Sequence, residues 1–126
     1  PSDGIEIMVT TRKGVDTIDG GLRDETSRGL VTKRVLPKLG LIELRGSLDW
    51  YQATDPAVKT PMGKVFAFRC QSPRKGDKEE ERECEVNYQY KDSLWLIYRF
   101  KRKHLADWRD IDRKVLGLLN SHIVDK

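Results

Sequence analysis

The fold of this chain is decided by residues 83–102, ECEVNYQYKDSLWLIYRFKR, in which two alternating stretches flank a short polar turn. In both stretches every second residue is apolar or aromatic: Cys84, Val86, Tyr88 and Tyr90, then Leu94, Leu96, Tyr98 and Phe100. This period of two is typical of half-buried strands, and the short turn between them predicts an antiparallel hairpin. If the turn centres on Asp92, Glu85 faces Arg99 and Glu83 faces Lys101, so the charges and the apolar faces agree on one register.

Further strands are expected upstream of this hairpin, at residues 5–12, 41–51 and 64–70, with a solvated loop at 71–82. Within 41–51, the side chains of Ile42, Leu44, Leu48 and Trp50 should share one face. Residues 22–36 fit two interpretations. The whole segment could be an amphipathic helix, or its last residues, 30–36, could be a strand that turns through residues 37–40 into the next strand. The β-branched residues at its end and the glycine at position 29 favour the strand.

The chain is expected to end in an amphipathic helix that begins near Asp107. Its apolar stripe recurs at steps of three and four residues: Trp108, Ile111, Val115, Leu118, Leu119 and His122. Such a helix should cover the apolar face of the hairpin. The sequence therefore predicts an α+β fold, in which an antiparallel β-sheet (a meander) packs against a C-terminal amphipathic helix.

Composition is that of one globular domain, residues 1–126, with 37% apolar and 35% charged residues. Lys and Arg number 24 against 20 Asp and Glu, and this net charge of +4 permits an anionic partner without requiring one. No apolar run is long enough to span a membrane. We expect an intracellular location, with peripheral membrane attachment if the protein binds acidic lipid.

Cys70 and Cys84 are expected to be free thiols, because the sequence shows no secretory signal and intracellular compartments are reducing. The two residues would nevertheless face each other if the 71–83 loop closes symmetrically about Asp77. They lack metal or redox spacing, and His104 and His122 add no zinc pattern. Phosphate-binding, dinucleotide-binding and nucleophile-elbow motifs are also lacking. We therefore expect no catalytic residues, no metal and no cofactor.

Basic residues gather where the second hairpin strand runs into the helix, and these are the candidate anion-binding residues: Arg99, Lys101, Arg102 and Lys103, with Lys33 and Arg34 if the fold brings them close. A compact basic patch attracts the phosphates of acidic phospholipid. We expect Lys101, Arg102 and Lys103 to lie at the edge of the sheet, so that reversing their charge would leave the fold intact. Alternatively, Arg99 and Lys101 are neutralised by Glu85 and Glu83. Nucleic acid is a weaker candidate, because the charges of the chain nearly balance.

Trp95 and Ile97 are apolar residues on the polar face of the hairpin. Two interpretations are open: either an N-terminal strand or loop covers these two side chains, or they form a partner-binding patch. The second possibility makes the chain a protein-interaction subunit of a larger complex that uses the face or edge of its sheet. Both interpretations describe a non-catalytic recognition module.

The carboxy half resembles the kinase-associated domain at the C-terminus of checkpoint and microtubule-affinity-regulating kinases. The resemblance rests on VFAFRC at 65–70, ECEVNYQY at 83–90, IYRFKR at 97–102 and the terminal helix, and it spans Val65 to Val124. It implies acidic-phospholipid binding or intramolecular restraint of a kinase domain. The first 60 residues match that family poorly, and a pleckstrin-homology-like fold, also closed by a C-terminal helix, fits the same pattern.

Overall fold

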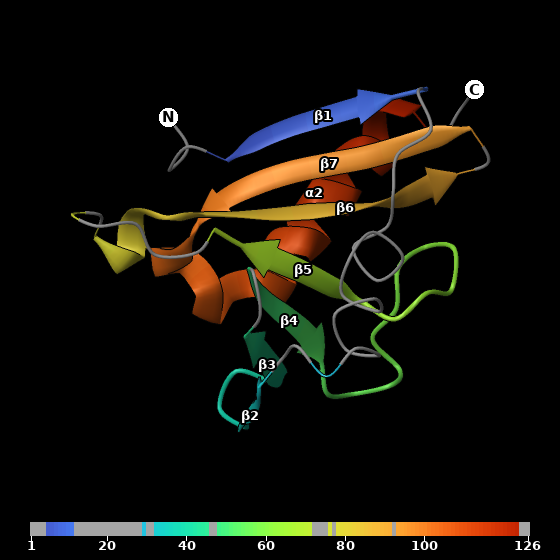
Figure 1. Cartoon of the computed structure of the whole chain (residues 1–126). Coiled ribbons are helices and arrows are strands. Elements are labelled where there is room, and N and C mark those ends of the chain that lie inside the picture. The colour runs from blue at the N-terminus through green and yellow to red at the C-terminus, as the bar shows by residue number, and fades with distance from the viewer. Residues whose placement is uncertain are drawn as a thin grey trace.

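The computed structural model describes residues 5–11, 29, 32–45, 48–71, 76, 78–91 and 93–123, without the side chains of 122 and 123. Its strands form one antiparallel sheet in the order β1-β7-β6-β5-β4-β3-β2, so β2 to β7 are a meander and β1 lies beside β7 (Figure 1). The strands are β1 (Glu6–Thr10), β2 (Thr32–Leu36), β3 (Leu41–Arg45), β4 (Asp49–Ala53), β5 (Ala67–Cys70), β6 (Glu83–Lys91) and β7 (Leu94–Lys101). Two short 3-10 helices, η2 (Glu79–Glu81) and η3 (Arg102–Asp107), precede β6 and α2 (Trp108–Ile123). The predicted α+β class is confirmed.

The β6–β7 hairpin has the predicted register. Val86 is opposite Tyr98 and Glu85 is opposite Arg99, while a register shift between Gln89 and Lys91 adjusts the pairing near the turn. The residues that were expected to be apolar partners are almost fully buried on both strands. Side-chain alternation and charge pairing thus identified the same arrangement, as a period of two requires.

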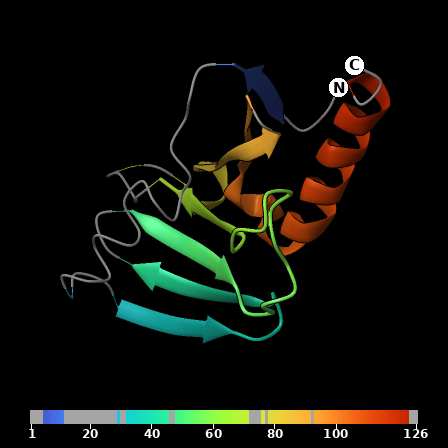
Figure 2. The ribbon, with the colours of Figure 1, turned by 90° about the vertical axis from the view of Figure 1, so that its right-hand side faces the viewer.

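Helix α2 covers one face of the sheet (Figure 2). The Trp108 ring stacks on Phe66 at 5.3 Å, and its indole nitrogen donates a hydrogen bond to the Leu39 carbonyl at 2.6 Å. Leu39 lies in the β2–β3 turn, where Gly40 has the positive φ of 70° that glycine adopts without strain. The buried helix stripe is Trp108, Ile111, Val115 and Leu119. Leu118 is half exposed, which corrects its predicted place in the core, and His122 lies outside the described side chains.

The single strand predicted over 41–51 is wrong. Two strands, β3 and β4, pair there as an antiparallel hairpin, with Leu44 opposite Trp50. The two apolar alternations happened to be in phase, so a period-two pattern could not separate them. The predicted face is nevertheless correct, because one cluster holds the apolar side chains of Ile42, Leu44, Leu48, Trp50 and Ala67.

The ambiguous segment 22–36 ends in strand β2, which turns through residues 37–40 into β3. The interpretation as a strand is confirmed for residues 32–36, and residues 22–28, 30 and 31 lie outside the described part. The predicted N-terminal strand is β1, and the predicted strand at 64–70 is β5.

Cys70 and Cys84 are opposite each other on β5 and β6, as the symmetric loop predicted. They form a disulfide, so the expectation of free thiols is wrong. Both residues are buried, at 1% and 0% exposure. Opposed positions on neighbouring antiparallel strands lie within reach of a disulfide. That geometry carried more information than the apparent absence of a secretory signal.

Candidate functional site

The predicted anion-binding residues of β7 and its end are engaged with carboxylates. Arg99 Nε lies 3.1 Å from Glu85, and Lys101 Nζ lies 2.9 Å from Glu81. The hydrogen bond and the charge of Glu81 raise the pKa of Lys101, and Lys101 in turn lowers the pKa of Glu81. Lys103 lies at 4.0 Å from the same carboxylate. Anion binding by these residues stays a prediction, and each would have to exchange an existing ion pair for it.

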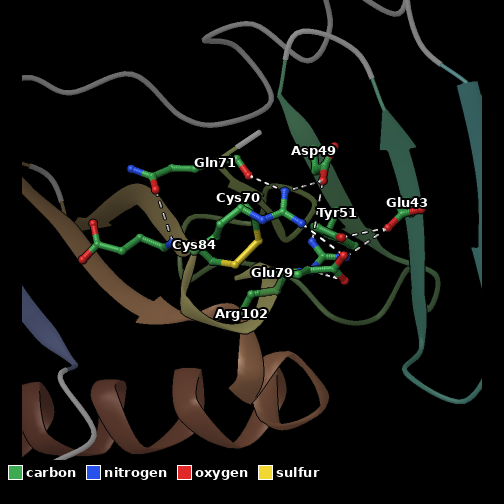
Figure 3. The surroundings of a disulfide bond; sticks show 10 residues. Glu43, Asp49, Tyr51, Cys70, Gln71, Glu79, Cys84 and Arg102 are labelled. Carbon is green, nitrogen blue, oxygen red and sulfur yellow. Dashed lines mark hydrogen bonds and ion pairs between the residues drawn. A yellow bond between two sulfur atoms is a disulfide. The ribbon is translucent and has the colours of Figure 1, made fainter. Parts of the chain in front are cut away.

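Arg102 does not lie at the sheet edge as predicted. Its side chain is only 9% exposed and continues the buried alternation of Tyr98 and Phe100. The guanidinium lies 3.6 Å from Glu43, 3.7 Å from Asp49 and 3.3 Å from Glu79 (Figure 3). A carboxylate at position 102 would therefore be buried among three others.

Arg34 and Arg102 approach the same carboxylate, that of Glu43, although Arg34 lies on the edge strand β2 and Arg102 follows β7. Arg34 and Arg45 lie 3.3 and 3.2 Å from Glu43 Oε1, and the Tyr51 hydroxyl donates a hydrogen bond to Oε2 at 2.8 Å. The sheet twists so that β2 to β4 run across the direction of β6 and β7, which brings these residues together (Figure 1).

The Glu43 carboxylate is held in its charged form. Burial alone would raise its pKa, but the Tyr51 hydroxyl and the nearby guanidinium groups together lower the pKa below its ordinary value. Lys33 is the neighbour of Arg34 on β2. Both residues line a hollow of about 340 Å³, together with Glu43 and Arg45. Whether the basic residues converge was left open by the sequence; Arg34 and Arg102 both lie next to Glu43, and Lys33 lines the neighbouring hollow.

Arg82 completes this site, and no sequence pattern pointed to it. It ends a loop that was expected to be solvated, yet its side chain is 4% exposed. Its guanidinium lies 3.2 Å from Glu79 and 3.8 Å from Asp49, and donates a hydrogen bond to the Gln71 carbonyl at 3.1 Å. We call this group of residues the arginine cluster: Arg34, Arg45, Arg82 and Arg102, with Glu43, Asp49, Glu79 and Tyr51.

The arginine cluster borders the disulfide. Gln71 follows Cys70 directly, and the backbone N–H of Arg102 donates a hydrogen bond to the Arg82 carbonyl at 2.8 Å (Figure 3). The disulfide thus holds together the ends of the loop that carries Arg82 and Glu79. Four guanidinium groups face three carboxylates, which leaves one surplus positive charge.

A second site is an apolar groove of about 460 Å³ between β1 and α2. Its lining residues are Ile5, Ile7, His104, Asp107, Asp110, Ile111, Lys114, Val115 and Leu118. Ile7 is 39% and Leu118 is 50% exposed, so two large apolar side chains face solvent here. Among the described strands β1 pairs only with β7, which leaves its other edge open.

Trp95 and Ile97, the predicted partner-binding residues, lie on β7 beside β1. Ile97 is opposite Met8 and Trp95 is opposite Thr10, so an N-terminal strand does lie alongside them. Trp95 is only 9% exposed and offers little side-chain surface to a partner. Beside the groove, the exposed apolar side chains are those of Ile7 on β1 and Leu118 on α2.

Asp112 of α2 falls outside the apolar stripe of the helix, yet it is half-buried. The hydroxyls of Tyr88 and Tyr98 each donate a hydrogen bond of 2.7 Å to its Oδ1 atom. Burial raises the pKa of Asp112 against the opposing effect of these two hydrogen bonds. The arrangement satisfies two buried hydroxyls and fixes α2 on the hairpin.

The described residues hold no group of three His, Cys, Asp or Glu side chains that could bind a metal ion. Within the same residues, no helix is long and apolar enough to cross a membrane. No protein-family model, curated protein or solved structure matches this chain. The resemblance to kinase-associated domains therefore stays a prediction.

Proposed function

We propose that this chain is a non-catalytic recognition module that binds an extended segment of a protein partner in the groove between β1 and α2. The observation that carries the proposal is the combination of a strand edge that no described strand pairs with and two half-exposed apolar side chains, Ile7 and Leu118, in one groove. Exposed apolar residues that gather at one place are typical of interaction surfaces.

A partner segment would bind as an added strand. Its backbone would hydrogen-bond to the open edge of β1, and its alternate apolar side chains would cover Ile7 and Leu118. Asp107, Asp110 and Lys114 line the groove, and Asp110 pairs with Arg113 at 3.2 Å. A basic residue of the segment would therefore find opposite charge at Asp107. We therefore expect the partner segment to combine alternating apolar residues with at least one Lys or Arg.

Binding to an acidic membrane through the β7 strand end is less favoured. Lys101 and Lys103 lie near Glu81, and Arg99 pairs with Glu85, so these cations already have carboxylate partners. A membrane surface attracts a protein through several lysines or arginines whose charge is not neutralised nearby. Nucleic-acid binding is disfavoured for the same reason.

The disulfide also indicates the kind of compartment in which the protein would bind its partner. Disulfides persist in oxidising compartments and are rare in reducing ones. We propose that the protein acts in an oxidising compartment, in place of the intracellular location that the sequence suggested. The Cys70–Cys84 bond and its complete burial support this proposal.

The proposal can be tested by selecting a displayed library of random peptides on the purified protein. Enriched peptides should alternate apolar residues and carry a basic residue. Leu118→Asp should weaken their binding at least tenfold, since it places a charge in the groove. Val35→Asp is the matched control, because Val35 is similarly exposed, at 53%, but lies on β2 at the opposite edge of the sheet.

Equal binding of the selected peptides to both variants, or no enrichment, would contradict the proposal. Two further measurements separate the alternatives. Sedimentation of the wild-type protein with phosphatidylserine vesicles at low salt would favour an anionic membrane. A homodimer in light scattering that Leu118→Asp dissociates would make a second copy of the chain the occupant of the groove.

A further inference from the structure

We propose that the arginine cluster is a second binding site, for a carboxylate on an acidic side chain of a protein partner, and that Glu79 occupies this site in the free protein. The inference does not depend on the groove between β1 and α2. It rests on the contacts, burial and charge count of the cluster.

Glu79 differs from the other two carboxylates of the cluster. Its Oε1 atom lies 3.2 Å from Arg82 Nη2 and its Oε2 atom lies 3.3 Å from Arg102 Nε, so one carboxylate bridges two arginines. Its side chain is 63% exposed, whereas those of Glu43 and Asp49 are 2% and 7% exposed. Glu79 belongs to the short helix η2, while Glu43 and Asp49 belong to strands. Glu79 can therefore leave by rotation of an exposed side chain, without opening the sheet.

Departure of Glu79 would leave the cluster in need of an anion. With Glu79 the cluster has four guanidinium groups and three carboxylates, and without it two positive charges are uncompensated. Arg82 and Arg102 are the two arginines that would lose this contact, and their side chains are 4% and 9% exposed. Both would keep Asp49, at 3.8 and 3.7 Å, and Arg102 would also keep Glu43 at 3.6 Å. These remaining carboxylates do not balance the buried positive charge, so an external anion would be drawn to the vacated position.

Unused hydrogen-bond donors belong to the same two arginines. Arg82 Nε and Arg102 Nη1 are buried and have no hydrogen-bond partner. Guanidinium groups bind carboxylates through two parallel N–H donors, and each arginine here uses only part of its fork on Glu79. The two arginines therefore have hydrogen-bonding capacity that the described residues do not use.

A carboxylate is the expected ligand because the site already holds one. Replacing Glu79 by the glutamate or aspartate of a partner exchanges like for like, so the exchange alone supplies little affinity and the partner must bind elsewhere as well. Helix η3 begins at Arg102 and ends at Asp107, a residue of the groove, so one partner can reach both places.

Chemical rescue tests the proposal directly. Glu79→Ala should lower the Tm of the protein, and added sodium acetate should restore most of the loss in a saturable manner, compared with sodium chloride at equal ionic strength. The matched control is Glu81→Ala, which removes a carboxylate of the same helix that pairs with Lys101 at the surface. Neither the control nor the wild-type protein should respond to acetate beyond the effect of chloride.

The arginine side chains supply an independent readout. In NMR spectra the Nε–Hε signal of Arg102 should shift in Glu79→Ala and return towards its wild-type position as acetate is added. Should the alanine variant fail to fold, Glu79→Gln keeps the shape of the side chain and removes its charge, and the same titration applies to it. Rescue by inorganic phosphate but not by acetate would overturn the carboxylate assignment. No response to either anion would overturn the site.

Discussion

Reduction of the Cys70–Cys84 disulfide is expected to lower the free energy of unfolding by about 3 kcal/mol. The two cysteines are 14 residues apart in the sequence. Closing a loop of that length removes about 10 cal/mol/K of entropy from the unfolded chain, which amounts to about 3 kcal/mol at 25 °C. The β5–β6 pairing should survive in the folded state, because the hydrogen bonds and the core around it do not require the sulfur bond.

The corresponding change in Tm can be estimated from the length of the chain. For 126 residues, an unfolding entropy of about 2.1 cal/mol/K per residue gives about 260 cal/mol/K near the midpoint. A loss of about 3 kcal/mol then lowers the Tm by about 11 °C. Both quantities can be measured on the same protein.

The assay is urea unfolding followed by tryptophan fluorescence, with and without a reductant. Reduction should move the midpoint to lower urea and increase the slope m, because the reduced unfolded chain exposes more surface. The control is Cys70→Ala combined with Cys84→Ala, whose unfolding should not respond to the reductant. A change below about 1 kcal/mol in the wild-type protein would refute the loop-entropy reasoning.

Three further predictions concern the sheet and the arginine cluster. Val86→Asp should unfold the protein, because it buries an unpaired charge under α2, whereas Glu85→Gln should cost under about 1 kcal/mol; equal costs in chemical denaturation would show that the two faces were misassigned. Because the pKa of Glu43 is lowered in the folded protein, its contribution to stability is complete above its ordinary pKa of 4.5 and is lost as the pH falls through the folded value. Urea midpoints of Glu43→Gln should therefore fall less on acidification than those of the wild-type protein, and parallel acid profiles would contradict this. Arg102→Glu should cost several kcal/mol and abolish the cooperative thermal transition, while Lys103→Glu should keep the wild-type circular dichroism spectrum and nearly its Tm; loss of the fold in Lys103→Glu would place that side chain in the cluster.

The β6–β7 hairpin was predictable because two independent patterns, side-chain alternation and opposite charges, agree on one register. The helix was predictable from its apolar stripe, except at Leu118. Periodicity reports which residues share a face of a helix, and it does not report whether another element covers that face. Leu118 is in phase with the core stripe but lies beside the edge strand β1, where the described residues leave the groove partly open.

The arginine cluster was beyond the reach of sequence patterns. Its members come from β2, β3, β4, the two 3-10 helices and the residue between η2 and β6, and their contacts depend on the twist of the sheet. Arg102 carries a signal that can be used in retrospect: it continues the alternation of Tyr98 and Phe100 and therefore belongs on the buried face. The basic run at residues 101–103 had suggested an exposed patch instead, because charged side chains are seldom fully buried.

Net charge does not show which cations are available to a ligand, because ion pairs already engage five of the six candidate anion-binding residues: Arg34, Arg99, Lys101, Arg102 and Lys103. Arg99, Arg102 and Lys101 each contact a carboxylate that is at least 14 residues away in the sequence. What distinguishes one ion pair from another is the exposure of the acid. Where the acid is buried, as Glu43 is, the pair belongs to the fold. Where it is exposed and sits on buried arginines, as Glu79 does, it occupies a position that another carboxylate could take, and that asymmetry is the feature from which binding at this end of the sheet can be inferred.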